Sequence, residues 1–481
     1  MSTHGKLAIL IIVLMIAPMV LAACGPTPEP QIVIQTVEVE KEVKVIETVE
    51  VEKEVKVVET VEVEKEVKVI ETVEVQVPAQ RTDIRIMMAI PVNAEVVMED
   101  LLDRFESANP DINVILDVVP YPTILEILPL QLETGEGPDI AKVSNIAGLY
   151  EYYLDMRPYL SEPAYWEENM GLTMQHMNPD GGNRISGFYT DVTVTGAFIN
   201  RTLFEQAGVP VPSDTSDKVT WEEWAEAARQ VRDATGVDFA MAIDRSGHRV
   251  STLTISQGAK LFDEDGNFVV DDEGMRRALQ LMLDWHADGT MPLDVWAGGD
   301  SYREATAEFI NGNLVFMMSG VWNVGPFTDQ IGDAFDWEVV PNPCGAVTCT
   351  GMPGGSVMAA MKATKHPEEV ARVMEFLAAE ENYHEWAARA LYIPQHNGIM
   401  AKGVDYATDL PQALRAFQVF GEESTHLDPL AYRLQNHLFG YVVMNAIRDR
   451  LTQAIVGELT LDEAIARMQA DIDGALAAAG N

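Results

Sequence analysis

The sequence predicts an α/β fold built on a parallel sheet. Strand-like apolar runs at residues 84–90 and 113–119 flank an amphipathic stretch at 96–105. Strand, helix and strand in this order form the unit from which parallel sheets are built. In the middle stretch, apolar residues recur at three- and four-residue spacing, which gives a helix one apolar face to lay on a sheet. These residues are Met98, Leu101, Leu102 and Phe105.

The first residues have the form of a bacterial lipoprotein signal peptide. Lys6 precedes an apolar run at 7–20, which ends at Leu-Ala-Ala followed by Cys24. The run is shorter than the roughly 20 residues that a transmembrane helix needs, and small residues before a lone Cys are what a lipoprotein signal peptidase requires. We expect residues 1–23 to be removed, Cys24 to carry lipid, and the body to lie outside the cytoplasmic membrane, at the cell surface or in the periplasm. An uncleaved helical anchor is the alternative.

Residues 24–80 are predicted to be a low-complexity stalk. After a Pro-rich start, the sequence Thr-Val-Glu-Val-Glu-Lys-Glu-Val-Lys-Val repeats every twelve residues from Thr36, Thr48 and Thr60. Val alternates with charged residues, a period typical of strands, and no aromatic residue is present to form a core. We expect a disordered or extended tether. Strand pairing between the stalks of neighbouring molecules is the alternative.

Charge and cysteine content limit the possible partners. The formal net charge of -42 argues against nucleic acid and against an anionic membrane surface, because either needs a basic face. No apolar run after Cys24 is long enough to cross a bilayer. Cys344 and Cys349 are close in sequence and are expected to face an oxidising exterior, so we expect them to pair. Two reduced thiols are the alternative.

Five short motifs follow one another in the body of the chain. They are Phe-Glu-Ser-Ala-Asn-Pro at 105–110, Gly-Pro-Asp-Ile at 137–140, Asn-Arg-Thr-Leu-Phe-Glu-Gln-Ala-Gly at 200–208 with Thr-Trp-Glu-Glu-Trp at 220–224, Phe-Ile-Asn-Gly-Asn at 309–313 leading to Gly-Val-Trp at 320–322, and Gly-Gly-Ser at 354–356 followed by Lys-His-Pro-Glu-Glu at 365–369. Together they resemble the extracellular solute-binding proteins of carbohydrate ABC importers, which are similar to maltose-binding and glycerol-phosphate-binding proteins. The resemblance covers about residues 84–465.

The resemblance implies a periplasmic-binding-protein-like fold of type II, with two α/β lobes, a ligand cleft and hinge crossings. It implies a monomer that captures a small solute, a mono- or oligosaccharide, and delivers it to ABC permease subunits. The first two crossings are expected near residues 191–196 and 343–353. The lobes are expected to comprise 81–192 with 350–395, and 193–349 with 396–481.

A neutral sugar needs flat aromatic faces for its C–H surface and planar polar groups for its hydroxyls. Trp322 matches a ligand-stacking position in the family. Asp191 ends a segment in which Tyr189 stands where the family commonly has Pro, and we expect its carboxylate to accept a ligand hydroxyl. The further candidates are Tyr189, Trp296, Tyr121, Asn145, Gly354, Gly355 and Arg389. For each candidate, an ordinary place in the core, in a turn or on the surface is the alternative.

Motifs of enzymes and metal sites are incomplete. His384-Glu385 lacks the second His of a zinc-protease helix, and Gly354-Gly355-Ser356 lacks the closing Gly of a nucleophile elbow. Phe268 stands where the calcium loop that residues 263–267 resemble needs Gly, so we expect an Asp-Gly hairpin there. We predict no catalytic residue, metal or cofactor. A surface lipoprotein glycosidase and a structural or adhesive stalked surface protein are the alternative functions.

The lipid anchor gives the first testable prediction. The wild-type protein should partition with membranes, and Cys24→Ser should release or misprocess it, because the acyl chains attach to that sulfur. Fractionation followed by mass spectrometry of the mature N-terminus measures both. An unlipidated wild type, with Cys24→Ser still in the membrane fraction, contradicts the prediction.

Overall fold

The computed structural model describes residues 44–50, 60–66, 81–297 and 304–480, which belong to two units, Met1–Gln80 and Arg81–Asn481. The predicted signal peptide, Cys24 and the rest of the stalk lie outside the described residues. In the first unit, β1 (Lys44–Glu50) and β2 (Thr60–Glu66) pair antiparallel, with Val49 opposite Val61. This pairing lies within one chain, whereas from the sequence we expected a disordered or extended tether, with pairing between molecules as the alternative.

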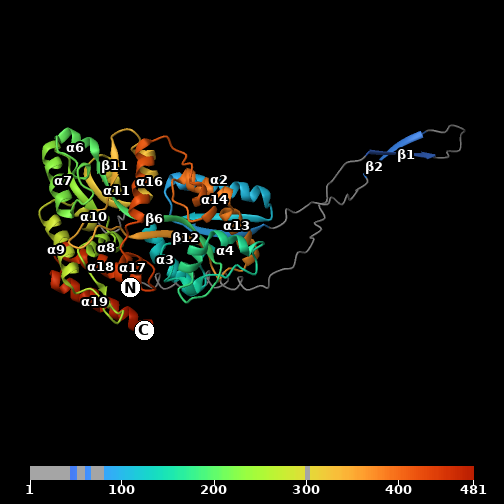
Figure 1. Cartoon of the computed structure of the whole chain (residues 1–481). Coiled ribbons are helices and arrows are strands. Elements are labelled where there is room, and N and C mark those ends of the chain that lie inside the picture. The colour runs from blue at the N-terminus through green and yellow to red at the C-terminus, as the bar shows by residue number, and fades with distance from the viewer. Residues whose placement is uncertain (1–43, 51–59, 67–80, 298–303, 481) are drawn as a thin grey trace, which may run out of the picture. The chain divides into compact units, whose positions relative to one another are not determined.

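A mixed eight-stranded sheet runs through the second unit (Figure 1). Its order is β4-β3-β5-β12-β6-β10-β7, and β11 pairs with β6. The strands are β3 (Thr82–Met88), β4 (Ile112–Val118), β5 (Ile140–Val143), β6 (Gly187–Asn200), β7 (Phe239–Ile243), β10 (Leu314–Gly320), β11 (Trp337–Val340) and β12 (Pro353–Ala360). Parallel pairing is confirmed for β3 with β4 and β5 and for β7 with β10. The prediction of parallel pairing is wrong for β6 and β12. These two strands are antiparallel because β6 carries the chain out of the first lobe and β12 returns it.

The long strand β6 belongs to both lobes. From Gly187 to Val194 it pairs with β12, and from Thr195 to Asn200 it pairs with β10 and β11. Nearly all of its side chains are buried, as expected for a strand covered on both faces and rich in β-branched and aromatic residues. Figure 1 shows β6 and β12 passing between the helices of the two lobes.

In the first lobe, helices cover both faces of the sheet. Ile84, Ile86 and Met88 of β3 point to the face covered by α2, α13 and α14, and Met87 points to the face covered by α3. This is the period-two alternation of a strand. The helices of this lobe are α2 (Val92–Ala108), α3 (Tyr121–Thr134), α4 (Pro163–Asn169), α5 (Gly171–Met177), α13 (Pro367–Ala378), α14 (Glu380–Ala390) and α15 (Asn397–Lys402).

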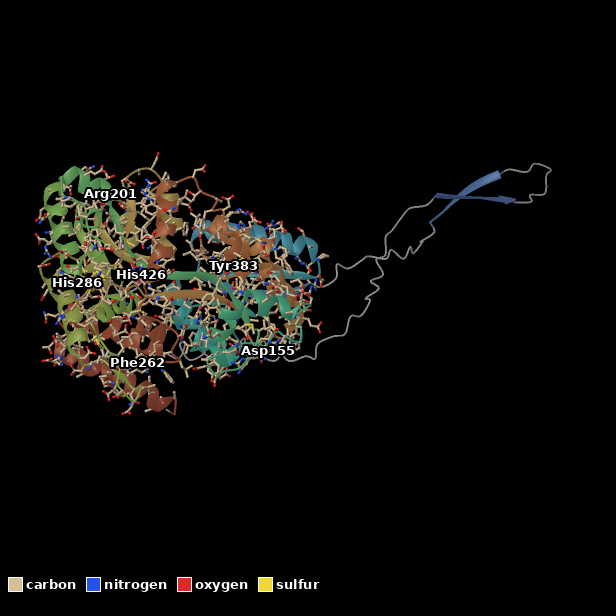
Figure 2. All side chains as sticks on the ribbon, in the orientation of Figure 1. Asp155, Arg201, Phe262, His286, Tyr383 and His426 are labelled. Carbon is tan, nitrogen blue, oxygen red and sulfur yellow. A yellow bond between two sulfur atoms is a disulfide. The ribbon has the colours of Figure 1, made fainter. Side chains whose placement is uncertain are left out.

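The second lobe has one continuous core. At its centre, the ring of Phe198 on β6 contacts the rings of Phe309, Phe327, Trp337 and Phe420. The helices of this lobe are α6 (Arg201–Ala207), α7 (Trp221–Thr235), α8 (Gly247–Ser256), α9 (Glu273–Ala287), α10 (Asp294–Ala297), α11 (Glu304–Ile310), α12 (Val324–Gln330), α16 (Pro411–Ser424), α17 (Pro429–Gln435), α18 (Gly440–Ile455) and α19 (Leu461–Ala478). In Figure 2, His286 lies in this lobe and Tyr383 in the first.

The motif at 200–224 stabilises helix ends. The Asn200 side chain accepts the Leu203 N–H at the start of α6, and Gly208 ends that helix at φ 66°, a left-handed conformation that favours glycine. Thr220 and Glu223 form a capping box at the start of α7. The most specific part of the family resemblance therefore stabilises the ends of two helices in the second lobe.

Packing marks a third crossing between the lobes. Ile399 and Val404 pack with the core of the first lobe, beyond the expected boundary at residue 395, and Leu410 packs with the second.

Cys344 and Cys349 form a disulfide with their Cα atoms 3.9 Å apart.

The hairpin expected around residues 263–267 is confirmed, since β8 (Leu261–Phe262) and β9 (Phe268–Val269) pair antiparallel. Within the described ranges, no helix combines the length and the apolar character needed to cross a membrane.

The hydrogen bonds that support β6 give the second prediction. The buried Tyr383 hydroxyl donates to the Tyr189 carbonyl and accepts the Gln395 N–H. Tyr383→Phe leaves both groups without this partner, so we expect it to lower the free energy of unfolding by about 1–3 kcal/mol. Tyr406→Phe is the control, because the Tyr406 hydroxyl makes one long bond of 3.3 Å to Tyr392. Urea unfolding of both variants measures the difference, and equal losses would contradict this role.

Candidate functional site

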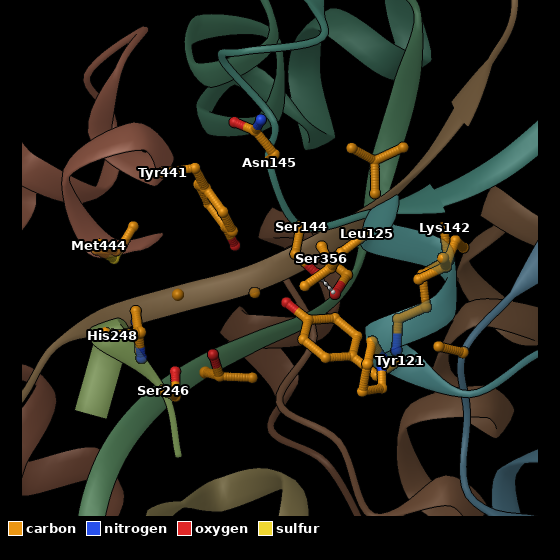
Figure 3. A pocket seen from close by; sticks show the side chains of 18 of the residues that line it. Tyr121, Leu125, Lys142, Ser144, Asn145, Ser246, His248, Ser356, Tyr441 and Met444 are labelled. Atoms are coloured by element: carbon orange, nitrogen blue, oxygen red, sulfur yellow. Dashed lines mark hydrogen bonds between the residues drawn. The ribbon is translucent and has the colours of Figure 1, made fainter. Parts of the chain in front are cut away.

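A cavity of about 560 Å³ opens between the two lobes, within the size range of small-molecule sites. Helix α3 and the loop after β5 line it from the first lobe, and the start of α8, Trp322 and helix α18 line it from the second. Between them lie β6 and β12, which contribute Asp191 and Gly354. Figure 3 shows Tyr121 and Leu125 of α3, Tyr441 and Met444 of α18, and the crossing strands around this pocket.

A buried ion pair links β5 to β6 across β12, which lies between these two strands in the sheet. The Nζ of Lys142 is 3.0 Å from Oδ1 of Asp191, and the two side chains are 9% and 6% exposed. The Thr190 hydroxyl lies 2.8 Å from Asp191 Oδ1 and 2.9 Å from the Ser356 carbonyl oxygen, so these two acceptors share its one proton. Both charged residues line the cavity. Since Oδ1 already has two partners, Oδ2 is the Asp191 oxygen that is better placed to accept a ligand hydroxyl.

The glycine pair at the start of β12 allows a close backbone approach. Gly355 has φ 139°, and a Cβ there would lie 2.5 Å from the Asp191 carbonyl oxygen. A Cβ at Gly354 would lie 2.7 Å from the Thr193 hydroxyl. A side chain at either position would therefore clash with β6. The absence of side chains exposes the backbone to the cavity beside Asp191.

Trp322 lies in the short turn at Val321–Asn323 that follows β10 and is partly buried. A Cβ at Gly320 would lie 2.2 Å from the Trp322 ring, so the ring needs glycine beneath it. The guanidinium carbon of Arg249 is 4.0 Å from the ring centroid, which is cation–π distance. These two contacts hold the indole at the cavity.

His248, at the start of α8, adds a neutral polar group. Its Nε2 is 2.9 Å from the Pro353 carbonyl oxygen, to which only a protonated nitrogen can donate. Burial and the neighbouring Arg249 cation lower the pKa of His248 to about 3, so the ring is neutral near pH 7. Nδ1 is then an acceptor, and among the described residues it has no hydrogen-bond partner.

Six of the nine predicted ligand residues line the cavity, and three lie elsewhere. The Trp296 indole donates to the Ile243 carbonyl at 3.1 Å and is 1% exposed, because the short helix α10 turns it into the core. The Tyr189 hydroxyl bonds His176 Nδ1 at 2.7 Å, and its ring lies under Gly355. Arg389 pairs with Asp100 and Glu385 on the outside of α14. The residues at the cavity are Trp322, Asp191, Tyr121, Asn145, Gly354 and Gly355.

Sequence reasoning missed Lys142, His248, Arg249 and Tyr441, all of which line the cavity. The sequence does hold a signal for His248 and Arg249. A polar segment, Asp-Arg-Ser-Gly-His-Arg at 244–249, directly follows the apolar run of β7, and ligands bind at the carboxyl ends of parallel strands. Lys142 lies inside a strand, and Tyr441 is in the first turn of a late helix. Neither position stands out locally.

Residues 92–384 match the bacterial extracellular solute-binding protein family. The match covers more than half of the chain, so the protein belongs to this family. Two known relatives extend the comparison. The arabinooligosaccharide-binding protein of Bacillus subtilis (strain 168) is 25% identical over 297 residues, 59% of this chain and 66% of that protein. The multiple sugar-binding protein of Streptococcus mutans serotype c is 20% identical over 314 residues, 60% of this chain and 70% of that protein.

Solved structures share the fold. An ABC transporter solute-binding protein from Agrobacterium vitis S4 with bound D-mannitol has a TM-score of 0.68 at 16% identity, over 83% of this chain and 99% of that chain. Maltose-bound T. maritima MalE3 has a TM-score of 0.65 at 19% identity, over 82% and 99%. The GacH receptor of Streptomyces glaucescens has a TM-score of 0.66 at 16% identity, over 81% of this chain and 96% of that chain. The fold is therefore periplasmic-binding-protein-like, with two α/β lobes.

The third prediction concerns His248. Its pKa falls from 6.5 to about 3 on folding, so below pH 6.5 the unfolded chain binds a proton that the folded chain does not, and stability falls as the pH falls towards 3. His248→Gln keeps a donor for Pro353 and removes this titration. Between pH 6 and 4 we expect the variant to lose roughly 2–3 kcal/mol less than the wild type. Unfolding curves across this range measure it, and parallel pH profiles would contradict it.

Proposed function

We propose that the cleft captures a neutral carbohydrate or related polyol, and that the protein delivers it to the permease of an ABC importer. The observation that carries this proposal is the composition of the cavity. Aromatic rings from both lobes, Tyr121, Trp322 and Tyr441, line it together with backbone and side-chain polar groups. A sugar needs both kinds of surface.

The charges at the cavity support a neutral ligand. Each lining cation lies near a carboxylate: Lys142 with Asp191, Arg245 with Asp449, Arg249 with Asp244, and Arg448 with Asp449. The Arg249 and Asp244 side chains, 7% and 2% exposed, are 3.6 Å apart. Charges paired in this way are poorly available to an ionised ligand, while their remaining lone pairs and N–H groups suit hydroxyls.

The relatives support the same ligand class. Two of them bind arabinooligosaccharides and one is named for multiple sugars. Fold neighbours hold maltose, acarbose and D-mannitol. The chain spans 66% and 63% of the two arabinooligosaccharide-binding proteins, so a mono- or oligosaccharide ligand is a proposal for this chain.

The anchoring and the lobes complete the proposal. Lipid on Cys24 would hold a monomer at the outer face of the cytoplasmic membrane, with residues 24–80 as a tether. The lobes would be 81–192 with 350 to about 405, and 193–349 with the C-terminal segment. They would close on the ligand by hinge motion in the crossings.

Binding without turnover distinguishes this function from a surface glycosidase. The matched relatives are named as binding proteins, and Asp191 is paired with Lys142. Release of reducing sugar from an oligosaccharide that stabilises the protein would favour the glycosidase. Unchanged sugar with a raised unfolding temperature supports the binding protein.

Trp322 gives the fourth prediction. If its ring covers a sugar face, Trp322→Ala removes contacts worth roughly 2–4 kcal/mol, and affinity falls by about thirtyfold or more. Calorimetric titration with a ligand identified by native mass spectrometry measures affinity, and unfolding without ligand measures stability. A large loss of stability with unchanged affinity would make Trp322 a core residue.

A further inference from the structure

Helix α3 has two apolar stripes, and the core covers one of them. Ile124, Leu128 and Leu132 are 3%, 2% and 5% exposed and pack into the first lobe, and Ile124 and Leu128 also touch the cavity. A second stripe at four-residue spacing, Tyr121, Leu125 and Pro129, lines the cavity, as residues one turn apart share a helix face. A helix on the surface of a domain normally has one such stripe, so the second stripe calls for a covering partner.

The second stripe, which we call the α3 wall, is mostly aliphatic. Pro122 extends it at the cavity. The opposite side of the cavity is polar, with Ser246, His248 and Arg448, and Figure 3 shows Ser246 and His248 away from the Leu125 side of the pocket. The second-lobe side of the cavity is therefore mainly polar and the α3 wall mainly apolar, although Glu126 of α3 and Lys142, Ser144 and Asn145 also line the cavity from the first lobe.

The contrast between the polar side of the cavity and the α3 wall favours some polyols over others. A sugar hydroxyl pressed against Leu125 or Pro129 would lose water and gain no hydrogen bond, which is unfavourable. An apolar group at the same place removes its own surface and that of the α3 wall from water. Leu125, Pro129 and Pro122 lack the π face on which a sugar ring stacks, and on this wall Tyr121 alone provides one.

We propose that the cleft binds a glycoside, with its sugar on the polar side and an apolar aglycone, aryl or short alkyl, against the α3 wall. This inference rests on the proposed carbohydrate function and specifies its ligand class. Paired charges around the cavity fit a ligand that is neutral at both ends. The other candidate for covering the α3 wall is helix α18, whose Tyr441 and Met444 line the same cavity and could meet the wall on closure.

Matched glycosides and a matched pair of leucines test the proposal. The mature full-length protein, in a detergent that contains no sugar, is titrated calorimetrically with methyl and p-nitrophenyl glycosides of arabinose, glucose and mannose. Leu125→Ser alters the α3 wall. Leu130→Ser, on the same helix, is the control, because Leu130 is 63% exposed and does not line the cavity. Thermal unfolding of both variants without ligand confirms that each is folded.

For the sugar that binds best, we expect the p-nitrophenyl glycoside to bind at least about tenfold more tightly than the methyl glycoside, from the apolar area it buries. Leu125→Ser should reduce this preference to about threefold or less, and Leu130→Ser should keep it.

Three results would overturn the inference. Equal affinity for methyl and p-nitrophenyl glycosides in the wild type refutes the aglycone and leaves the carbohydrate function intact. Equal weakening of both glycosides by Leu125→Ser assigns the wall to closure against α18. Binding of none of the glycosides, nor of any free sugar or oligosaccharide, refutes the proposed function itself.

Discussion

Strand β6 is the constraint on which the rest of the structure depends, because a single continuous strand pairs with β12 in one lobe and with β10 and β11 in the other. Its path is held by side chains of α14: the Tyr383 hydroxyl and the Trp386 indole donate to the carbonyls of Tyr189 and Thr190. Those carbonyls immediately precede Asp191. The residue at the centre of the cleft is thus positioned by helix packing in the first lobe, while the strand continues into the core of the second.

Glycines shape the cavity, because they allow neighbouring backbone and ring atoms to approach closely. Gly355 and Gly354 let β12 lie against β6, and Gly320 lets the Trp322 ring fold back over its own strand. Arg249 covers this ring and pairs with Asp244. The site therefore consists of a few polar groups held by ion pairs and of aromatic faces held by glycines, and this preorganisation lowers the cost of binding a flexible polyol.

The sequence allowed the class of fold to be predicted well and the site only in part, for physical reasons. Strand β3 and helix α2 follow from local periodicity. The motif at 200–224 indicated the family, and its conspicuous residues are those that cap helices. Trp322 could be found because the motif around it matches a ligand-stacking position in the family. Trp296 was misplaced because a loop-like composition does not reveal that a short helix turns its ring inward. Lys142 reaches the cleft because of strand order, which depends on pairings distant in sequence.

Hydrogen exchange with and without saturating oligosaccharide tests most directly whether the solute lies between the lobes. The measurement follows amides of α3 and β12 together with those at the starts of α8 and α18, on both sides of the cavity. Our account predicts that an arabino- or malto-oligosaccharide slows exchange in all four segments, since ligand and closure exclude water from both walls. Protection confined to one lobe, or to a surface away from the cavity, would contradict it.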